Sequence, residues 1–333
     1  MINPLKYFRN RTVGLVLGSG GSKGIAHISV IEYLESMGIP INMIAGSSMG
    51  AIIGTIYSLG CLKKFKEDLL KISRKDMMSI FDPVFPRSGL IAGKSIVDFL
   101  KRYIPNDANI EDLKIPMSIV ATDYYNGRSV IFRSGNILEA IRASISLPGI
   151  LVPVRFKSTF LIDGGVANPL PINVVKSMGA GITIAVNLHP RLNEKKFKKY
   201  IKLKNERWKS IIDASDIEII EDHDDIDCGI PHKNVGWLHS VENWLGVGRE
   251  KKKQKDDFEV PNIFEIISQT VDIMEYVNTM LMLKYGPPNV LIEPKVMDIP
   301  TLDFTKSAAV ITEGFLACAK AKKSLIRKVK MWI

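Results

Sequence analysis

Cysteine and histidine are scarce in this sequence. The 333 residues include three cysteines, Cys61, Cys228 and Cys318, and five histidines. The cysteines are odd in number and widely spaced, which argues against a disulfide framework and against a cysteine-based metal site. We therefore expect free thiols and a reducing compartment.

Long uninterrupted apolar runs are also missing. The first eleven residues carry charge but no apolar segment of the length that a signal peptide needs, so we expect no secretion. The most apolar stretch, residues 36–62, has glycines spaced as in a close-packed membrane helix, but Pro40, Asn42 and the serines at 47 and 48 interrupt it. We predict a cytoplasmic protein without a transmembrane helix, with peripheral contact at a membrane.

Acidic residues are outnumbered by basic ones. Lysine and arginine number 45 against 35 aspartates and glutamates, which gives a net charge of +10 at pH 7. This excess favours anionic partners, either lipid headgroups or nucleic acid, and does not by itself separate them. The length allows one large domain or two, with a substantial core.

One stretch joins a predicted strand to a candidate nucleophile. Residues 41–45 are apolar, and residues 46–50 (GSSMG) follow with the G-x-S-x-G spacing of a nucleophile elbow. The pattern places Ser48 on a sharp turn before a predicted helix, where small neighbours such as Gly46 and Gly50 are needed. A five-residue pattern also occurs by chance, so this interpretation needs support from the rest of the chain.

A glycine-rich turn follows the first predicted strand, residues 12–17. The turn, residues 18–24 (GSGGSKG), leads into a predicted helix over residues 25–37. A dinucleotide fingerprint would need glycine at Lys23, and a P-loop would need glycine before that lysine and serine or threonine after it. An oxyanion hole remains as the functional interpretation, and a plain strand-to-helix turn is the structural alternative.

The order of these elements resembles that of the patatin-like phospholipases. A strand, a G-x-G-G-x-[K/R]-G loop, a helix, a second strand and G-x-S-x-G are followed by residues 160–166 (FLIDGGV), which fit the family's D-G-[G/A] motif. Residues 121–123 (ATD) and 142–149 (RASISLPG) look like further family segments. The resemblance covers residues 13–187. Together with the alternation of predicted strands and helices, it implies a three-layer α/β fold with a mostly parallel central sheet and helices on both faces.

The resemblance also implies a role for each motif. Ser48 would be the nucleophile and Asp163 would accept its proton directly, in a dyad without histidine. Gly20 and Gly21 would donate backbone hydrogen bonds to the oxyanion. Lys23 would bind an anion or brace the loop, unless it is a solvated lysine at a helix start. No metal or cofactor is implied.

His189 is the alternative partner for Ser48. It follows a predicted strand over residues 181–188 and would complete the order serine, acid, histidine that α/β-hydrolases show. A single histidine at a strand end is more commonly structural or solvated. His27 is expected to pack within the first predicted helix, and the histidines at 223, 232 and 239 give only a weak metal signal.

Composition divides the chain into three predicted parts. Residues 1–189 form the catalytic core, and residues 190–260 are a charged, partly mobile insertion whose lysines and tryptophans suit a membrane surface. Residues 261–333 return to helical spacing. They resemble the closing elements of bacterial patatin-like proteins, which implies that this helix-strand-helix unit packs back on the core.

The resemblance implies a serine lipid acyl hydrolase of the phospholipase A or lysophospholipase type. Its substrate would be a phospholipid or another lipid ester, cleaved through an acyl-enzyme at Ser48. One alternative keeps the dyad and acts on a non-phospholipid ester or a thioester. Another is a non-catalytic membrane-binding protein that retains the fold. Nucleic acid is not an expected partner.

Overall fold

Eight strands form one sheet at the centre of the computed structural model, which describes residues 12–72, 92–190 and 263–330. The predicted insertion at residues 190–260 lies, apart from its first residue, outside these ranges. The strands are β1 (Val13–Leu17), β2 (Met43–Ser47), β3 (Met117–Asp123), β4 (Ser129–Phe132), β5 (Val154–Phe156), β6 (Thr159–Asp163), β7 (Ile182–Val186) and β8 (Val290–Ile292).

The sheet is parallel at its centre and antiparallel at one edge. Its order is β5-β6-β3-β2-β1-β7-β8, with β4 paired to β3. The pairs that join β3, β2, β1, β7 and β8 are all parallel, whereas β3–β6, β3–β4 and β5–β6 are antiparallel. Strands β1, β2 and β7 are buried along their whole length, as parallel strands covered on both faces are.

Helices cover both faces of this sheet. Because successive side chains of a strand point to opposite faces, Leu15 and Leu17 of β1 join one core, with α1, α2 and α11, and Val16 joins the other, with α7. The predicted three-layer α/β fold is therefore confirmed. The helices are α1 (Ala26–Ser36), α2 (Met49–Ser58), α3 (Leu62–Lys71), α5 (Lys94–Leu100), α6 (Ile137–Ser144), α7 (Ile172–Ser177), α10 (Ile263–Tyr285) and α11 (Ser307–Leu325).

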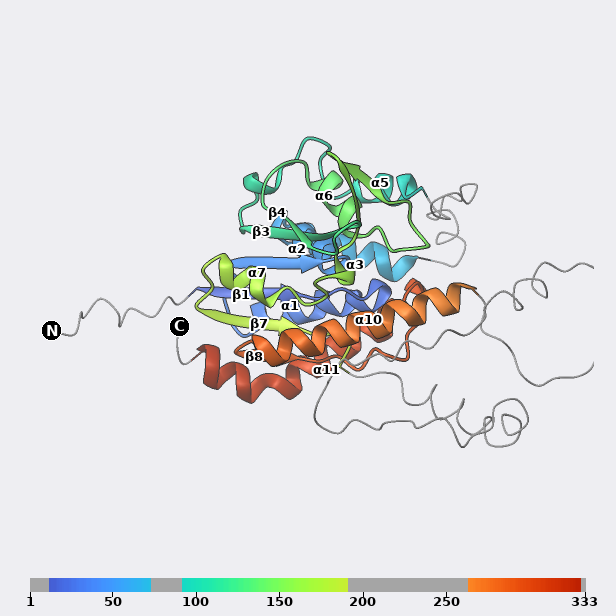
Figure 1. The fold of residues 1–333 in the computed structure, drawn as a ribbon. Helices are drawn as coiled ribbons and strands as arrows, with labels where there is room; N and C mark the ends of the chain where they lie inside the picture. The colour runs from blue at the N-terminus through green and yellow to red at the C-terminus, as the bar shows by residue number, and fades with distance from the viewer. Residues whose placement is uncertain (1–11, 73–91, 191–262, 331–333) are drawn as a thin grey trace, which may run out of the picture. The chain divides into compact units, whose positions relative to one another are not determined.

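The elements after residue 262 extend the same sheet and cover it (Figure 1). Strand β8 pairs with β7 in parallel, and α11 packs on α1 so closely that a Cβ on Gly314 would overlap Ala26 and Ser29. The Ser29 hydroxyl donates to the carbonyl of Ile311 at 2.6 Å. Segments from the two ends of the chain thus share one core.

Two short elements escape the sequence patterns. Strand β5 has three residues, too few to show an alternation, and α7 begins directly after Pro169 and Pro171, which predict a loop. Conversely, the membrane-helix alternative for residues 36–62 is wrong, because this stretch contains strand β2 and the ten-residue helix α2. None of the described helices combines the length and apolarity required to cross a bilayer.

Candidate active site

Ser48 occupies the sharp turn between β2 and α2. Its φ of 53° lies in the left-handed region, which among the described non-glycine residues only Lys157 shares. A Cβ on Gly46 would collide with the backbone of Gly50, and a Cβ on Gly50 would collide with the carbonyl of Leu17. The turn is therefore a strained strand-to-helix elbow in which both flanking glycines are required for space.

The hydroxyl of Ser48 donates to Asp163. The distance from Oγ to the Asp163 Oδ2 atom is 2.6 Å, and the backbone N–H of Gly165 donates to the other carboxylate oxygen at 2.7 Å. Asp163 ends strand β6 and is 2% exposed. Burial raises the pKa of this carboxyl to about 6, although the hydrogen bonds from Ser48 and Gly165 lower it. Near neutral pH the group is mainly ionised and poised to accept a proton.

Two further side chains hold the backbone of this pair. Ser144 accepts a hydrogen bond from the Ser48 N–H at 2.9 Å and donates to the carbonyl of Val120 at 2.6 Å. Thr122 donates to the carbonyl of Asp163 at 2.8 Å. Ser144 lies in residues 142–149 and Thr122 lies in residues 121–123. These are the two segments that resemble the family and whose function the sequence left unassigned. Their role is to fix the relative position of Ser48 and Asp163.

The glycine-rich turn lies beside the elbow because β1 and β2 are parallel neighbours, with Leu17 opposite Gly46. The N–H groups of residues 18, 19, 22 and 23 all have carbonyl acceptors, whereas within the described part of the chain those of Gly20 and Gly21 have none. Both glycines have positive φ, 148° and 53°. The turn therefore offers two unused N–H donors next to Ser48.

Residues 15–176 match the family model of the patatin-like phospholipases. The chain has this family's domain over that segment, 162 of its 333 residues. It is 40% identical over 177 residues to an uncharacterised NTE family protein of Mycobacterium tuberculosis, a match that covers 53% of this chain and 49% of that protein. It is 36% identical over 187 residues to lysophospholipase NTE1 of Scheffersomyces stipitis, over 54% of this chain and 12% of that protein.

The chain thus spans about half the length of the mycobacterial relative and a small part of the yeast one. Among solved structures, VipD from Legionella pneumophila has a TM-score of 0.37 at 15% identity, covering 96% of this chain and 77% of that chain. The family assignment depends on the sequence match, and the matched segment carries Ser48, Asp163 and the glycine-rich turn.

An apolar pocket of this patatin-like fold opens onto Ser48, Asp163 and Gly21. Its described walls come from α2, α3, α5 and α10, from the segment after α6, and from residues 301–304. Hydrophobic side chains of several sizes form most of this surface, including Met49, Ile52, Phe65, Leu69, Phe99 and Leu151. The pocket suits a flexible hydrocarbon chain whose polar end reaches Ser48.

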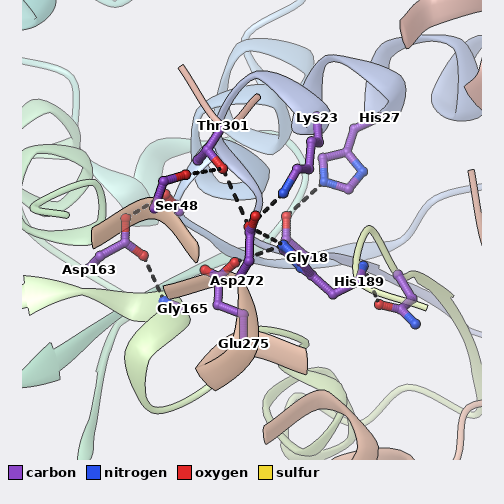
Figure 2. A network of polar contacts seen from close by, with 12 residues as sticks. Gly18, Lys23, His27, Ser48, Asp163, Gly165, His189, Asp272, Glu275 and Thr301 are labelled. Carbon is purple, nitrogen blue, oxygen red and sulfur yellow. Dashed lines mark hydrogen bonds and ion pairs between the residues drawn. The ribbon is translucent and has the colours of Figure 1, made fainter. Parts of the chain in front are cut away.

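Lys23 points away from solvent into a buried polar cluster (Figure 2). Its side chain is 0% exposed, and its Nζ lies 2.6 Å from the Asp272 Oδ1 atom on α10. The solvated-lysine alternative is therefore wrong, and the ammonium group faces a carboxylate of the protein itself. Anion binding by Lys23 finds no support in this arrangement, which favours bracing of the loop.

His189 belongs to the same cluster. Its Nε2 atom lies 3.0 Å from Glu275 Oε2 and 3.4 Å from Asp272 Oδ1, both on α10. Burial lowers the pKa of His189, although the neighbouring Asp272 carboxylate raises it. The Ser48 hydroxyl donates to Asp163, so the contacts of His189 are those of a structural residue.

His27 has a separate structural contact. It is buried in α1, and its Nε2 donates to the carbonyl of Gly18 at 2.8 Å. Burial lowers the pKa of His27 to about 4, which keeps the ring neutral. This hydrogen bond fixes the backbone at Gly18, where the glycine-rich turn begins.

Three ligand-type side chains in the cluster approach one another. The side-chain donor atoms of His189, Asp272 and Glu275 all lie within 4.8 Å of each other. The Lys23 ammonium group already neutralises Asp272, and burial raises the pKa of Glu275 to about 8, which keeps it largely protonated near neutral pH. Since metal ligands must be deprotonated, the cluster fits an internal ion-pair network better than a metal centre.

Sequence patterns miss Asp272 and Glu275. Both lie on α10, outside the family-matched segment, and Asp272 follows Lys23 by 249 positions. Neither residue sits in a motif, and acidic residues on an amphipathic helix are ordinarily solvated. Only their burial beside the glycine-rich turn distinguishes them.

Proposed function

We propose that this chain is a serine lipid acyl hydrolase that cleaves an acyl ester through a Ser48/Asp163 dyad. The observation that carries the proposal is the 2.6 Å hydrogen bond from the Ser48 hydroxyl to a buried carboxylate. It occurs on a strained elbow beside the unused N–H groups of Gly20 and Gly21. A strained backbone and a buried carboxylate both cost stability, and a nucleophilic role accounts for both.

The catalytic cycle follows from these positions. The Ser48 oxygen attacks the ester carbonyl while Asp163 takes its proton. The N–H groups of Gly20 and Gly21 donate to the oxyanion of the tetrahedral intermediate. When the intermediate collapses, the alcohol leaves with the proton held by Asp163, and the acyl group stays on Ser48. A water molecule then attacks the acyl-enzyme and gives a proton to Asp163. Asp163 passes this proton to the Ser48 oxygen as the bond to the acyl group breaks, which releases the fatty acid and restores the serine hydroxyl.

The pocket supports a substrate with an apolar acyl chain. Its described walls are mostly apolar side chains, and Ser48 is one of the residues that line it. The yeast relative is named a lysophospholipase. We infer that the substrate class is a phospholipid or lysophospholipid acyl ester, with other esters or thioesters as the alternative for the same dyad. Peripheral contact with an anionic membrane, suggested by the net charge of +10, is part of this proposal.

A fluorophosphonate probe tests the activated serine. Wild-type protein should be labelled and should release fatty acid from a lysophospholipid, whereas Ser48→Ala and Asp163→Asn should lose labelling and turnover. Ser36→Ala, at an exposed serine on α1, is the matched control and should behave as wild type. His189→Ala should keep far more labelling than Ser48→Ala, and an equal loss would favour a triad.

Two results would contradict the proposal. One is labelling of folded Ser48→Ala at the wild-type rate. The other is folded wild-type protein that neither reacts with the probe nor cleaves short esters, in which case liposome binding would test the non-catalytic alternative.

A further inference from the structure

The glycine-rich turn is held from outside the family-matched segment. Directly after Gly21, the Ser22 N–H donates to the carbonyl of Thr301 at 2.8 Å, and the Ser22 hydroxyl donates to the carbonyl of Pro300 at 2.8 Å. One residue further, Lys23 reaches Asp272 on α10. Two contacts of Ser22 and one of Lys23 therefore attach the end of the glycine-rich turn, just after Gly20 and Gly21, to the C-terminal part of the chain.

The ion pair is the strongest of these contacts. The Lys23 side chain is 0% exposed and that of Asp272 is 13% exposed, so little water competes for the 2.6 Å contact. Burial by itself would raise the pKa of Asp272, but the hydrogen bond with His189 and the charge of Lys23 lower it to about 2. Asp272 therefore stays ionised across the pH range in which an esterase works, and the pair persists.

Gly20 and Gly21 cannot hold their own positions. They have no side chains, and glycine adopts negative φ values as readily as the positive values that these two residues have. Instead, their surroundings confine them: a Cβ on Gly21 would overlap the carbonyl of Thr301, and a Cβ on Gly20 would lie 2.9 Å from the Leu188 side chain. The direction in which their N–H groups point is thus set by neighbours, among which Ser22 is fixed by residues 300 and 301 and Lys23 by Asp272.

We propose that Asp272 is a positioning residue for ester hydrolysis, which fixes the Gly20 and Gly21 N–H groups through its contact with Lys23. The inference rests on the proposed function, because it assumes that these N–H groups receive the oxyanion. Figure 2 shows the arrangement: Asp272 of α10 reaches the Lys23 ammonium group, and Ser48 lies to one side of this pair, in contact with Asp163. Helix α10 is then part of the working active site, although it lies outside the segment that carries the dyad.

Geometry explains why such a brace matters. Oxyanion donors act at about 2.7–3.1 Å from the developing charge, and removal of one donor costs about 10²–10³ in kcat. A misplacement of about 1 Å has a comparable effect. Neither Lys23 nor Asp272 lines the pocket that we propose for the substrate's acyl chain. Loss of the brace should therefore lower kcat and leave KM nearly unchanged.

The experiment compares Asp272→Asn, Asp272→Glu and the double variant Lys23→Met/Asp272→Leu in the full chain. Asp272→Asn leaves a buried ammonium group unpaired and is expected to lower the melting temperature, whereas the double variant removes both charges and should recover it. Asp272→Glu keeps the charge but displaces it by one methylene group. Glu32→Gln, which removes the partner of Lys66 in a half-exposed ion pair, is the matched control.

The readouts are kcat and KM on a soluble short-chain ester, and the affinity for a trifluoromethyl ketone, which forms an oxyanion adduct with an active serine. We expect kcat to fall about 10²-fold in the double variant and in Asp272→Glu, with KM within about twofold. The affinity for the ketone should fall by the same factor as kcat/KM. Glu32→Gln should match wild type in all three quantities.

A purely structural ion pair would give a different result. The double variant would then recover kcat together with its melting temperature, and ketone affinity would be unchanged, which would overturn the inference. If the double variant does not fold, wild-type kcat in Asp272→Glu would overturn it equally. If wild type itself shows no reactive serine, the proposed function fails and this inference falls with it. An active wild type with unaffected Asp272 variants rejects the inference alone.

Discussion

The Glu275 carboxyl group lies directly against Gly165, so closely that a Cβ on this glycine would overlap Oε1. Gly165 in turn donates its N–H to Asp163, the proposed base. The site therefore holds a second buried acid beside the first. Burial, and then the charge of Asp163, raise the pKa of Glu275 to about 8, so it is largely neutral near neutral pH. Because their pKa values differ, Asp163 can be ionised and accept a proton at a pH at which Glu275 is still protonated.

This pair predicts the pH dependence of turnover. Asp163 must be ionised to accept a proton, so kcat/KM should rise as pH passes its pKa of about 6. Ionisation of Glu275 at about pH 8 places a second negative charge near Asp163 and the forming oxyanion, so kcat/KM should then decline. The measurement is kcat/KM on a soluble ester across this range.

Glu275→Gln is the control for this profile, because glutamine imitates the neutral acid. It should retain activity near neutral pH and the acid limb of the profile while losing the alkaline decline. An unchanged alkaline decline in this variant would exclude Glu275 as its cause.

The same raised pKa predicts how stability varies with pH. The folded-state pKa of Glu275, about 8, lies above its ordinary value of 4.5, so the folded protein binds this proton more tightly than the unfolded chain. The resulting stability is fully present below pH 4.5 and is lost as pH rises through about 8. Thermal unfolding from about pH 5 to about pH 9 should therefore show wild type losing stability relative to Glu275→Gln. A difference in melting temperature that is the same at every pH would contradict this assignment.

A matched pair of glycine variants tests the unused donors. Gly21→Ala places a Cβ against the carbonyl of Thr301 at a φ of 53°, so the turn must move and kcat should fall about 10²-fold. Gly38 has a similar φ of 69° with nothing within 4 Å of an added Cβ, so Gly38→Ala should cost about 1 kcal/mol of stability and no activity. Steady-state kinetics and thermal unfolding distinguish them. Equal kcat values in the two variants would show that the turn takes no part in catalysis.

A variant of Ser144 tests whether Ser48, the proposed nucleophile, depends on the hydrogen bond that its N–H donates to Ser144. Ser144→Ala removes the acceptor of the buried Ser48 N–H, which should cost about 1–3 kcal/mol in the free energy of unfolding. The elbow should also loosen and kcat should fall. Ser58→Ala removes a hydroxyl that bonds within its own helix, to Gly54, and should cost less and leave kcat unchanged. Urea unfolding and the labelling rate of Ser48 are the measurements, and a wild-type labelling rate in Ser144→Ala would refute the supporting role.

Much of the fold and of the dyad follows from local sequence patterns. Strand β1, the elbow and the D-G-G turn can be located because each needs particular residues at fixed spacing: apolar strand residues, glycine where a Cβ would collide, and an acid at a strand end. These requirements are met within a few residues of chain. The boundaries of β1 and α1 agree with their predicted ranges, residues 12–17 and 25–37, to within one residue.

What the local patterns leave open depends on contacts between distant segments. Lys23 had several compatible roles in the sequence, and its partner Asp272 lies 249 positions away without a motif of its own. The sequence by itself determined the strand-turn-helix units and the proposed nucleophile and base. Only the tertiary structure decided which carboxylate reaches Lys23, why Glu275 is neutral, and that α10 lies beside the glycine-rich turn, because burial and ion pairing arise when the chain closes on itself.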